Sequence, residues 1–197
     1  MINIENNSDT VIIVIHEIYG INQHMKDICQ SLSEKDFDVI CPNFLQQGAP
    51  FDYSQEEVAY DNFMKNIGFT HVLNKIKSLL EEIKDKYKKV YIIGFSVGAT
   101  IAWLCSKDEN INGIVGYYGS RIRDYVEIDP LPPIMLFFPQ KEQSFDVDKL
   151  ILCLEEKNIE IHKFYGHHGF SDPFSPKYNA KSAQEAFRKM VDFFLKH

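Results

Sequence analysis

Short apolar runs alternate with helix-forming segments along almost the whole chain, and this alternation constrains the fold more than any other feature of the sequence. Runs that are apolar throughout are typical of strands buried on both faces, and crossover helices join such strands in parallel. The sequence therefore predicts an α/β fold with a mostly parallel sheet of six or seven strands flanked by helices. We expect strands at residues 11–16, 37–41, 89–95, 111–118, 133–139 and 159–165, a short edge strand within 1–6, and helices at 22–35, 70–86, 97–107, 146–157 and 179–196.

Residues 71–86 show the helical spacing most clearly. Apolar side chains recur every three or four residues, and Lys and Glu occupy the remaining positions. This pattern predicts a surface crossover helix with one buried stripe. The stripe consists of Val72, Ile76, Leu79, Leu80 and Ile83.

Residues 43–69 form the least regular segment, rich in aromatic residues but without a sustained period. We expect a short helix around 55–66, and we expect the segment to border the functional site, as long insertions in α/β proteins often do. The sequence contains no internal repeat, low-complexity tract or Pro/Gly/Ser-rich linker. A single domain spanning residues 1–197 is therefore expected.

The charge balance bears on the binding partner. The chain carries 21 Lys and Arg against 28 Asp and Glu, a net charge of −7, which disfavours nucleic acid and anionic membrane surfaces as partners. A small-molecule substrate is expected instead. The first residues do not resemble a signal peptide and no apolar run is long enough to span a bilayer, so we expect a cytoplasmic protein. The four cysteines are far apart in the sequence and are expected to be free, buried thiols.

The most informative motif is Gly94-Phe95-Ser96-Val97-Gly98, which fits G-x-S-x-G between an apolar run and a helix-forming segment. In such a sharp turn the serine hydroxyl is lifted out of the fold, and glycines stand where a Cβ would collide with backbone. The turn also aims the N–H of Val97 at a developing oxyanion. No Lys follows Gly98, which excludes a P-loop. The motif predicts that Ser96 is a nucleophile.

A serine nucleophile needs a base, and the sequence offers His167 and His168 in a glycine-flanked loop after the last predicted strand. Adjacent histidines also suit a metal site or a polar loop. His16 and Glu17 begin like a zinc-protease motif, but Gly20 stands where the second histidine ligand belongs. We therefore expect neither a metal nor a cofactor.

Three segments together resemble the dienelactone hydrolase family of the α/β-hydrolase superfamily: residues 16–20 (His-Glu-Ile-Tyr-Gly), the elbow at 94–98, and residues 165–170 around the histidines. The resemblance covers most of the chain and implies the α/β-hydrolase fold, a three-layer sandwich. It selects His168, which stands just before Gly-Phe, as the base. It also implies that the N–H of Ile18 joins that of Val97 in an oxyanion hole, and that Glu17 and Tyr118 lie near the nucleophile. The alternative for Glu17 is an exposed or helix-capping acid.

Two departures from the family pattern affect the expected chemistry. The founding enzymes have cysteine where this chain has Ser96, a change that needs a stronger base but no new geometry. Those enzymes also hold a substrate carboxylate with arginines, one of them shortly after the histidine, where this chain has none. Dienelactone itself is therefore not the expected substrate. Arg121 and Arg123 are the alternative anion contacts, with a purely solvated role as the other interpretation.

The orienting acid has two candidates. The resemblance places the acid on the loop after the strand at 133–139, where Glu142 occupies the matching position. Asp146 is the alternative, but it precedes a predicted helix and suits an N-cap. We predict a Ser96-His168-Glu142 triad.

These residues predict a serine hydrolase that cleaves a small ester, lactone or related acyl bond through an acyl-enzyme. A thioesterase or peptidase could use the same triad. A binding module that has lost turnover is the alternative from another class, since a fold alone does not establish activity. The oligomeric state has no signature in the sequence.

Overall fold

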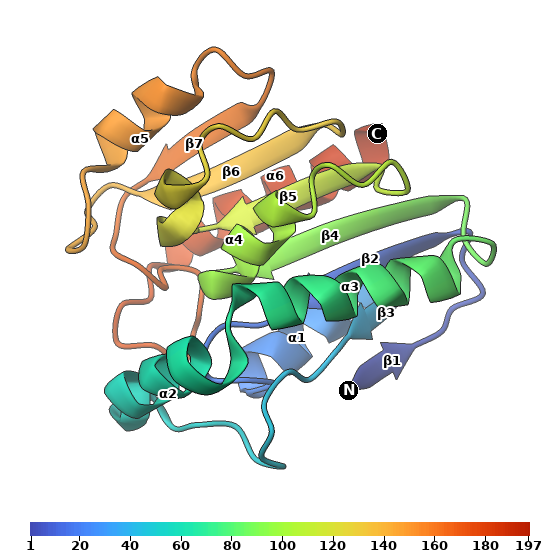
Figure 1. Cartoon of the computed structure of the whole chain (residues 1–197), viewed down its shortest axis with the longest axis horizontal. Helices are drawn as coiled ribbons and strands as arrows, with labels where there is room; N and C mark the ends of the chain where they lie inside the picture. Colours follow the sequence, from blue (N-terminus) through green and yellow to red (C-terminus); the bar gives the residue numbers. More distant parts are fainter.

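A seven-stranded sheet runs through the middle of the molecule (Figure 1) in the computed structural model, which describes residues 1–197. The strand order is β1-β3-β2-β4-β5-β6-β7; β1 is antiparallel to β3 and all other neighbours are parallel. This is the α/β-hydrolase fold that the sequence predicts. The strands are β1 (Ile2–Ile4), β2 (Thr10–Ile15), β3 (Asp38–Cys41), β4 (Lys89–Phe95), β5 (Gly113–Tyr117), β6 (Ile134–Pro139) and β7 (Glu160–Phe164).

The helices lie where the sequence predicts them, with ends that differ by a few residues. They are α1 (Gln23–Ser33), α2 (Glu56–Asn62), α3 (Phe69–Ile83), α4 (Val97–Leu104), α5 (Val147–Leu154) and α6 (Ala180–Lys196), with short turns η1 (Tyr53–Gln55), η2 (Phe63–Ile67) and η3 (Ser120–Asp124). The short helix expected around 55–66 is α2, extended by η1 and by the π-helical η2. The N–H of Gly68 donates to the carbonyl of Phe63 at 2.7 Å, and the left-handed backbone of Gly68 (φ 75°) then redirects the chain into α3.

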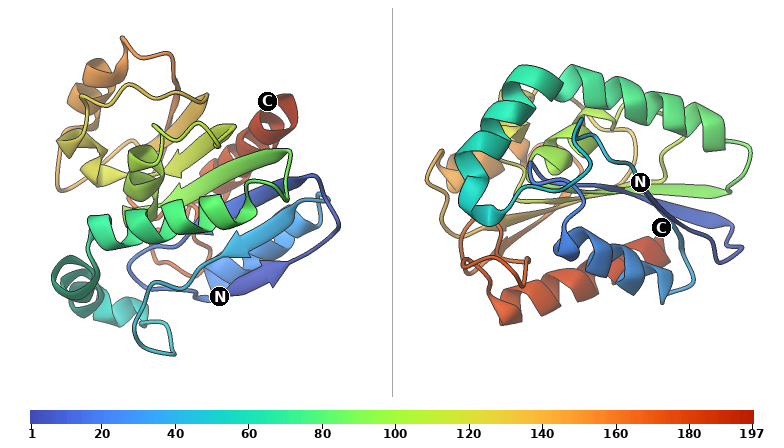
Figure 2. Two further views of the ribbon diagram at one scale, coloured as in Figure 1. Left: turned by 45° about the vertical axis from the view of Figure 1, so that its right-hand side comes forward. Right: turned by 90° about the horizontal axis from the view of Figure 1, so that it is seen from below.

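Helices cover both faces of the sheet, as the right-hand view in Figure 2 shows, with α1 and α6 on one side and α2 to α5 on the other. Alternate residues of β2 pack into the two hydrophobic cores, one on each face of the sheet. Ile13 belongs to the core shared with α3 and α4, whereas Ile12 and Val14 belong to the core shared with α1 and α6. Both faces are therefore buried, which explains the uninterrupted apolar runs.

The buried stripe of α3 agrees with its predicted periodicity, because Val72, Ile76, Leu80 and Ile83 are buried. The expectation for the cysteines is wrong at one position. Three thiols are buried, but Cys153 is exposed. Helix α5 turns its stripe of Val147, Leu150 and Leu154 inward, and Cys153 lies off that stripe.

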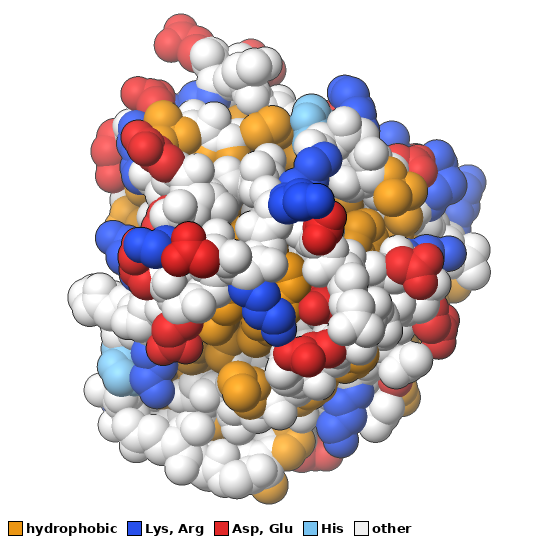
Figure 3. All heavy atoms as spheres, turned by 90° about the vertical axis from the view of Figure 1, so that its right-hand side faces the viewer, with side chains coloured by type: hydrophobic (Ala, Val, Ile, Leu, Met, Phe, Trp, Pro, Cys, Tyr) orange, Lys and Arg blue, Asp and Glu red, His pale blue; other side chains and the backbone are white.

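The face formed by the N-terminal ends of the strands carries interspersed acidic and basic side chains (Figure 3). Lys86 pairs with Glu5 at 2.7 Å and Lys88 with Asp9 at 2.6 Å, joining the loop before β4 to the loop before β2. These exposed pairs contribute little to stability. No helix of the structure combines the length and the apolar composition that crossing a bilayer requires.

Candidate active site

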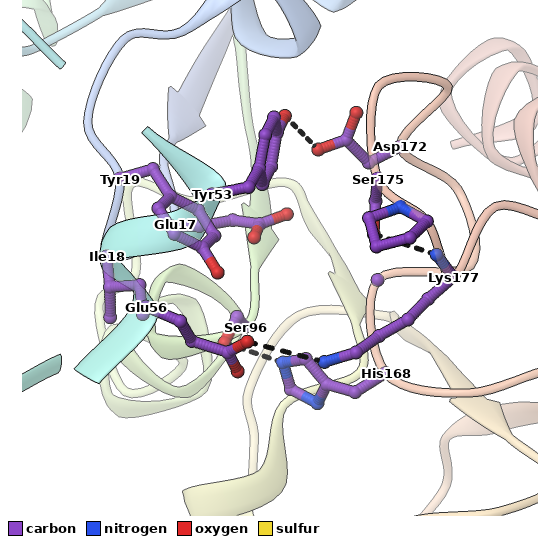
Figure 4. A pocket seen from close by; sticks show the side chains of 12 residues that line it. Glu17, Ile18, Tyr19, Tyr53, Glu56, Ser96, His168, Asp172, Ser175 and Lys177 are labelled. Atoms are coloured by element: carbon purple, nitrogen blue, oxygen red, sulfur yellow. Dashed lines mark hydrogen bonds and ion pairs between the residues drawn. The ribbon is translucent and has the colours of Figure 1, made fainter. Parts of the chain in front are cut away.

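The predicted site residues converge at the C-terminal edge of the sheet, where the chain order reverses between β2 and β4. From β2 the chain proceeds to β3 on one side, and the strands from β4 onward lie on the other. Such a switch point is where α/β sheets bind ligands. Glu17 and Ile18 follow β2, Ser96 follows β4 and His168 follows β7, and Figure 4 shows them around one pocket.

The turn between β4 and α4 holds Ser96 in a strained conformation, with φ 54° and ψ −115°. Both flanking glycines are required by close backbone contacts. A Cβ on Gly94 would lie 2.2 Å from the carbonyl oxygen of Gly98, and a Cβ on Gly98 would lie 2.3 Å from that of Ile15. The end of β2, the end of β4 and the start of α4 therefore pack without room for a side chain, as the motif predicts.

A chain of hydrogen bonds connects Ser96, His168 and Glu142. The Oγ of Ser96 lies 2.9 Å from Nε2 of His168, and Nδ1 of His168 lies 2.7 Å from Oε1 of Glu142. The Glu142 side chain is 5% exposed. Because a buried carboxylate accepts, Nδ1 carries the imidazole proton, which leaves Nε2 free to accept the serine proton.

The rival candidates lie elsewhere. Asp146 caps α5, accepting from the N–H groups of Asp148 at 3.1 Å and Lys149 at 3.3 Å. His167 is exposed and lines a cavity beside the site without contacting Ser96. The geometry therefore brings together the three residues of the predicted triad and leaves both alternatives outside it.

The two predicted oxyanion donors border the same space. Ile18 and Val97 are buried, and both line a cavity together with Ser96. Val97 is the first residue of α4, so its N–H has no acceptor within the helix. The partial positive charge of the helix N-terminus adds to the attraction for an anion there.

Two cavities adjoin Ser96 and His168. The smaller, about 70 Å³, extends inward toward Glu17, and the larger, about 410 Å³, opens outward past Arg121 and Lys141. An ion pair of 3.6 Å between Glu56 and Lys177 joins α2 to the loop after His168, and both residues line both cavities (Figure 4). The segment 43–69 therefore borders the site, as expected from its irregular sequence.

The structure separates Arg121 from Arg123. The Arg121 guanidinium lines the larger cavity and donates to the Tyr60 hydroxyl at 2.8 Å and to Asp124 at 3.1 Å. Arg123 instead lies over the ring of Phe145, at 5.2 Å, and lines neither cavity. Of these two arginines, only Arg121 is placed to contact a molecule beside Ser96.

Glu17 is buried beneath the site rather than exposed. The hydroxyl of Tyr118, a residue with a left-handed backbone (φ 42°), donates to Oε1 of Glu17 at 3.0 Å and lies 3.0 Å from Oγ of Ser171. The Tyr118 ring also lies 4.9 Å from that of His168. Burial, reinforced by the nearby Asp172 carboxylate, raises the pKa of Glu17 to about 7.

His16 follows β2 and connects the end of this strand to the loop after β3. Its Nε2 accepts from the N–H of Phe44 at 3.0 Å, so Nδ1 carries the proton and donates to the carbonyl of Glu17 at 2.6 Å. Burial of this neutral ring lowers the pKa of His16 to about 4. His16 is therefore a structural residue that holds the backbone around Glu17.

Sequence reasoning missed His24, Tyr53 and Asp172, which lie beside Glu17. The Tyr53 hydroxyl donates to Oδ2 of Asp172, and Nδ1 of the buried His24 ring lies within 4 Å of both carboxylates, at 3.6 Å from Asp172 and 3.9 Å from Glu17. Glu17, His24 and Asp172 form a buried group of side chains of the types that bind metals. Because His24 and Asp172 are far apart in the sequence, no spacing motif could have revealed the group.

Comparisons with known proteins agree with this architecture. The sequence pattern of the dienelactone hydrolase family matches residues 2–197. A Bacillus subtilis (strain 168) protein, YczH, is 41% identical over 176 residues, covering 86% of this chain and 84% of that protein. A Yersinia pestis protein that bears the name "Putative carboxymethylenebutenolidase" is 26% identical over 209 residues. The match covers 95% of this chain and 78% of the Yersinia protein. A crystal structure from Klebsiella pneumoniae that bears the name "Putative Dienelactone Hydrolase" superimposes with a TM-score of 0.80 at 20% identity, covering 95% of this chain and 87% of the other.

Proposed function

The chain belongs to the dienelactone hydrolase family and is a carboxylic ester hydrolase, and on that premise we propose that it acts through a Ser96-His168-Glu142 triad. The observation that carries the proposal is the continuous hydrogen-bonded chain from Ser96 Oγ through the imidazole to the Glu142 carboxylate. A serine hydroxyl becomes an effective nucleophile when a neighbouring base accepts its proton. The Glu142 carboxylate stabilises the imidazolium that then forms.

In the proposed reaction, Ser96 attacks the acyl carbonyl while Nε2 of His168 takes the hydroxyl proton. The negative charge that develops on the carbonyl oxygen is held by the N–H groups of Ile18 and Val97. His168 then gives the proton to the departing alkoxide, which leaves Ser96 acylated. A water molecule then attacks the acyl group while His168 takes its proton, and His168 returns that proton to Ser96 Oγ as the acid is released.

The cavities support a small, polar ester or lactone as the substrate. The larger cavity, about 410 Å³, falls in the range of small-molecule sites, and few of its lining residues are apolar. Arg121 and Lys141 lie on its wall, where they favour a substrate with polar or anionic groups away from the scissile bond. A panel of esters, lactones, thioesters and peptides separates an esterase from a thioesterase or a peptidase with the same triad.

The decisive experiment compares Ser96→Ala with Ser78→Ala, a matched change at an exposed position on α3. We expect Ser96→Ala to abolish hydrolysis of a small activated ester and labelling by a fluorophosphonate probe, and Ser78→Ala to retain both. Circular dichroism checks that both variants fold. Retained turnover or labelling in Ser96→Ala would overturn the proposal.

A further inference from the structure

The imidazole of His24 lacks hydrogen bonds in a fully buried setting. His24 is 1% exposed, it is the second residue of α1, and neither ring nitrogen has a hydrogen-bond partner. Its Nδ1 lies 3.6 Å from Oδ2 of Asp172 and 3.9 Å from Oε1 of Glu17, beyond the normal length of a hydrogen bond. Buried polar atoms without partners are rare in native proteins, and both ring nitrogens of His24 are available to a ligand.

The two carboxylates facing His24 also lack a compensating charge. Glu17 is 5% and Asp172 is 1% exposed, and neither forms an ion pair with any Lys or Arg. Lys177, the lysine that lines the smaller cavity, pairs with Glu56 instead. Buried carboxylates are normally paired, protonated or bound to a metal.

Hydrogen bonds from neighbouring residues hold the carboxylates of Glu17 and Asp172 in place, as outer hydrogen bonds do for ligands at metal sites. Tyr118 donates to the Oε1 atom of Glu17, and Tyr53 donates to the Oδ2 atom of Asp172. The other Asp172 oxygen accepts from the N–H of Phe174 at 2.9 Å. Outer hydrogen bonds of this kind hold ligand side chains in place at metal sites.

We propose that Glu17, His24 and Asp172 bind a divalent transition-metal ion, with Zn²⁺ as the best match to their donors. Their three ligand atoms lie within 4.8 Å of one another. Donors around a four-coordinate Zn²⁺ with bonds of about 2.1 Å lie roughly 3.4 Å apart, so small side-chain movements complete the site. An imidazole nitrogen with two carboxylates disfavours Mg²⁺ and Ca²⁺, which prefer oxygen donors alone.

The site communicates with solvent through the smaller cavity. Glu17, Tyr53 and Asp172 line this cavity together with Ser96 and His168 (Figure 4), so an ion enters along the path that leads past the nucleophile. The donors themselves are separate from the proposed triad. Metal binding is therefore expected whether or not Ser96 is catalytic, and it is tested without an activity assay.

The test uses the full-length chain, stripped of metal by a chelator and dialysed. Zn²⁺ is titrated by calorimetry, and the zinc retained after desalting is measured by mass spectrometry. The variants are His24→Gln and Asp172→Asn. The matched control is His162→Gln, which removes the more exposed His162–Glu160 pair, joined at 2.6 Å. Circular dichroism without zinc verifies that each variant is folded.

We expect one tightly bound Zn²⁺ per wild-type chain, an affinity at least tenfold lower in His24→Gln and Asp172→Asn, and no change in His162→Gln. Mg²⁺ should not compete. Crystals of the wild type soaked in Zn²⁺ should show an anomalous peak between the three donor atoms, a measurement that does not depend on the variants' folding. Absence of zinc binding, equal affinity in all folded variants, or an anomalous peak only elsewhere would each overturn the proposal.

Discussion

His16 should make the protein sensitive to mild acid, because the folded chain keeps this histidine neutral. Both ring nitrogens are engaged, one accepting from Phe44 and the other donating to the carbonyl of Glu17. Protonation of Nε2 would place a second N–H against the Phe44 donor, in a buried site. The unfolded chain has neither constraint, so protons bind preferentially to the unfolded state as the pH falls.

The size of the effect follows from the pKa of His16, which burial lowers from 6.5 to about 4. A folded-state pKa below the unfolded value gives stability that is fully present above pH 6.5 and is lost as the pH falls toward 4. Between these two pKa values the free energy of unfolding falls by about 1.4 kcal/mol for each pH unit, so His16 alone should lower it by about 2 kcal/mol at pH 5 and about 3 kcal/mol at pH 4. Glu17 acts in the opposite direction, because its raised pKa adds stability as the pH falls.

The assay is urea unfolding between pH 7.5 and 4.5, with a chelator present, of the wild type, His16→Gln and the exposed-site control His71→Gln. Subtracting the His16→Gln curve removes the contributions that both proteins share, including that of Glu17. Wild type and His71→Gln should lose about 2 kcal/mol more than His16→Gln between pH 7.5 and pH 5. Parallel curves for wild type and His16→Gln would refute a buried neutral imidazole.

Two further predictions test the elbow and the acid. Gly98→Ala should destabilise the fold by about 1–3 kcal/mol and reduce ester hydrolysis, because its Cβ meets the Ile15 carbonyl at 2.3 Å, whereas Gly48→Ala, with nothing within 4 Å, should match the wild type in thermal unfolding. An equally stable Gly98→Ala would contradict the packing argument. Glu142→Gln should reduce kcat on an activated ester at least about a hundredfold, whereas Asp146→Asn preserves a capping side chain and should have little effect. A larger loss in Asp146→Asn would identify Asp146 as the acid.

The fold could be predicted closely because each local pattern agrees with the global architecture. Strands buried on both faces must be apolar throughout, and α3 must present an apolar stripe at helical spacing. The pattern of apolar residues in the sequence therefore predicts which side chains are buried. Cys153 escaped prediction because a cysteine suits either face of an amphipathic helix. The π-helical ending of α2 at Gly68 also has no clear sequence signal, since its i→i+5 hydrogen bond reflects packing.

In the candidate site, too, some features follow from a local sequence motif and others only from the tertiary structure. The elbow around Ser96 is a local motif, because neighbouring backbone segments demand glycine at fixed positions, and the sequence alone could reveal it. The choice between Glu142 and Asp146 depended on which carboxylate reaches the imidazole, and only the tertiary structure could decide that geometry. The sequence determined the nucleophile's turn and the layered fold through short-range constraints. The meeting of Glu17, His24 and Asp172 arises because parallel strands bring distant loops to one edge of the sheet, a long-range consequence that no local spacing encodes.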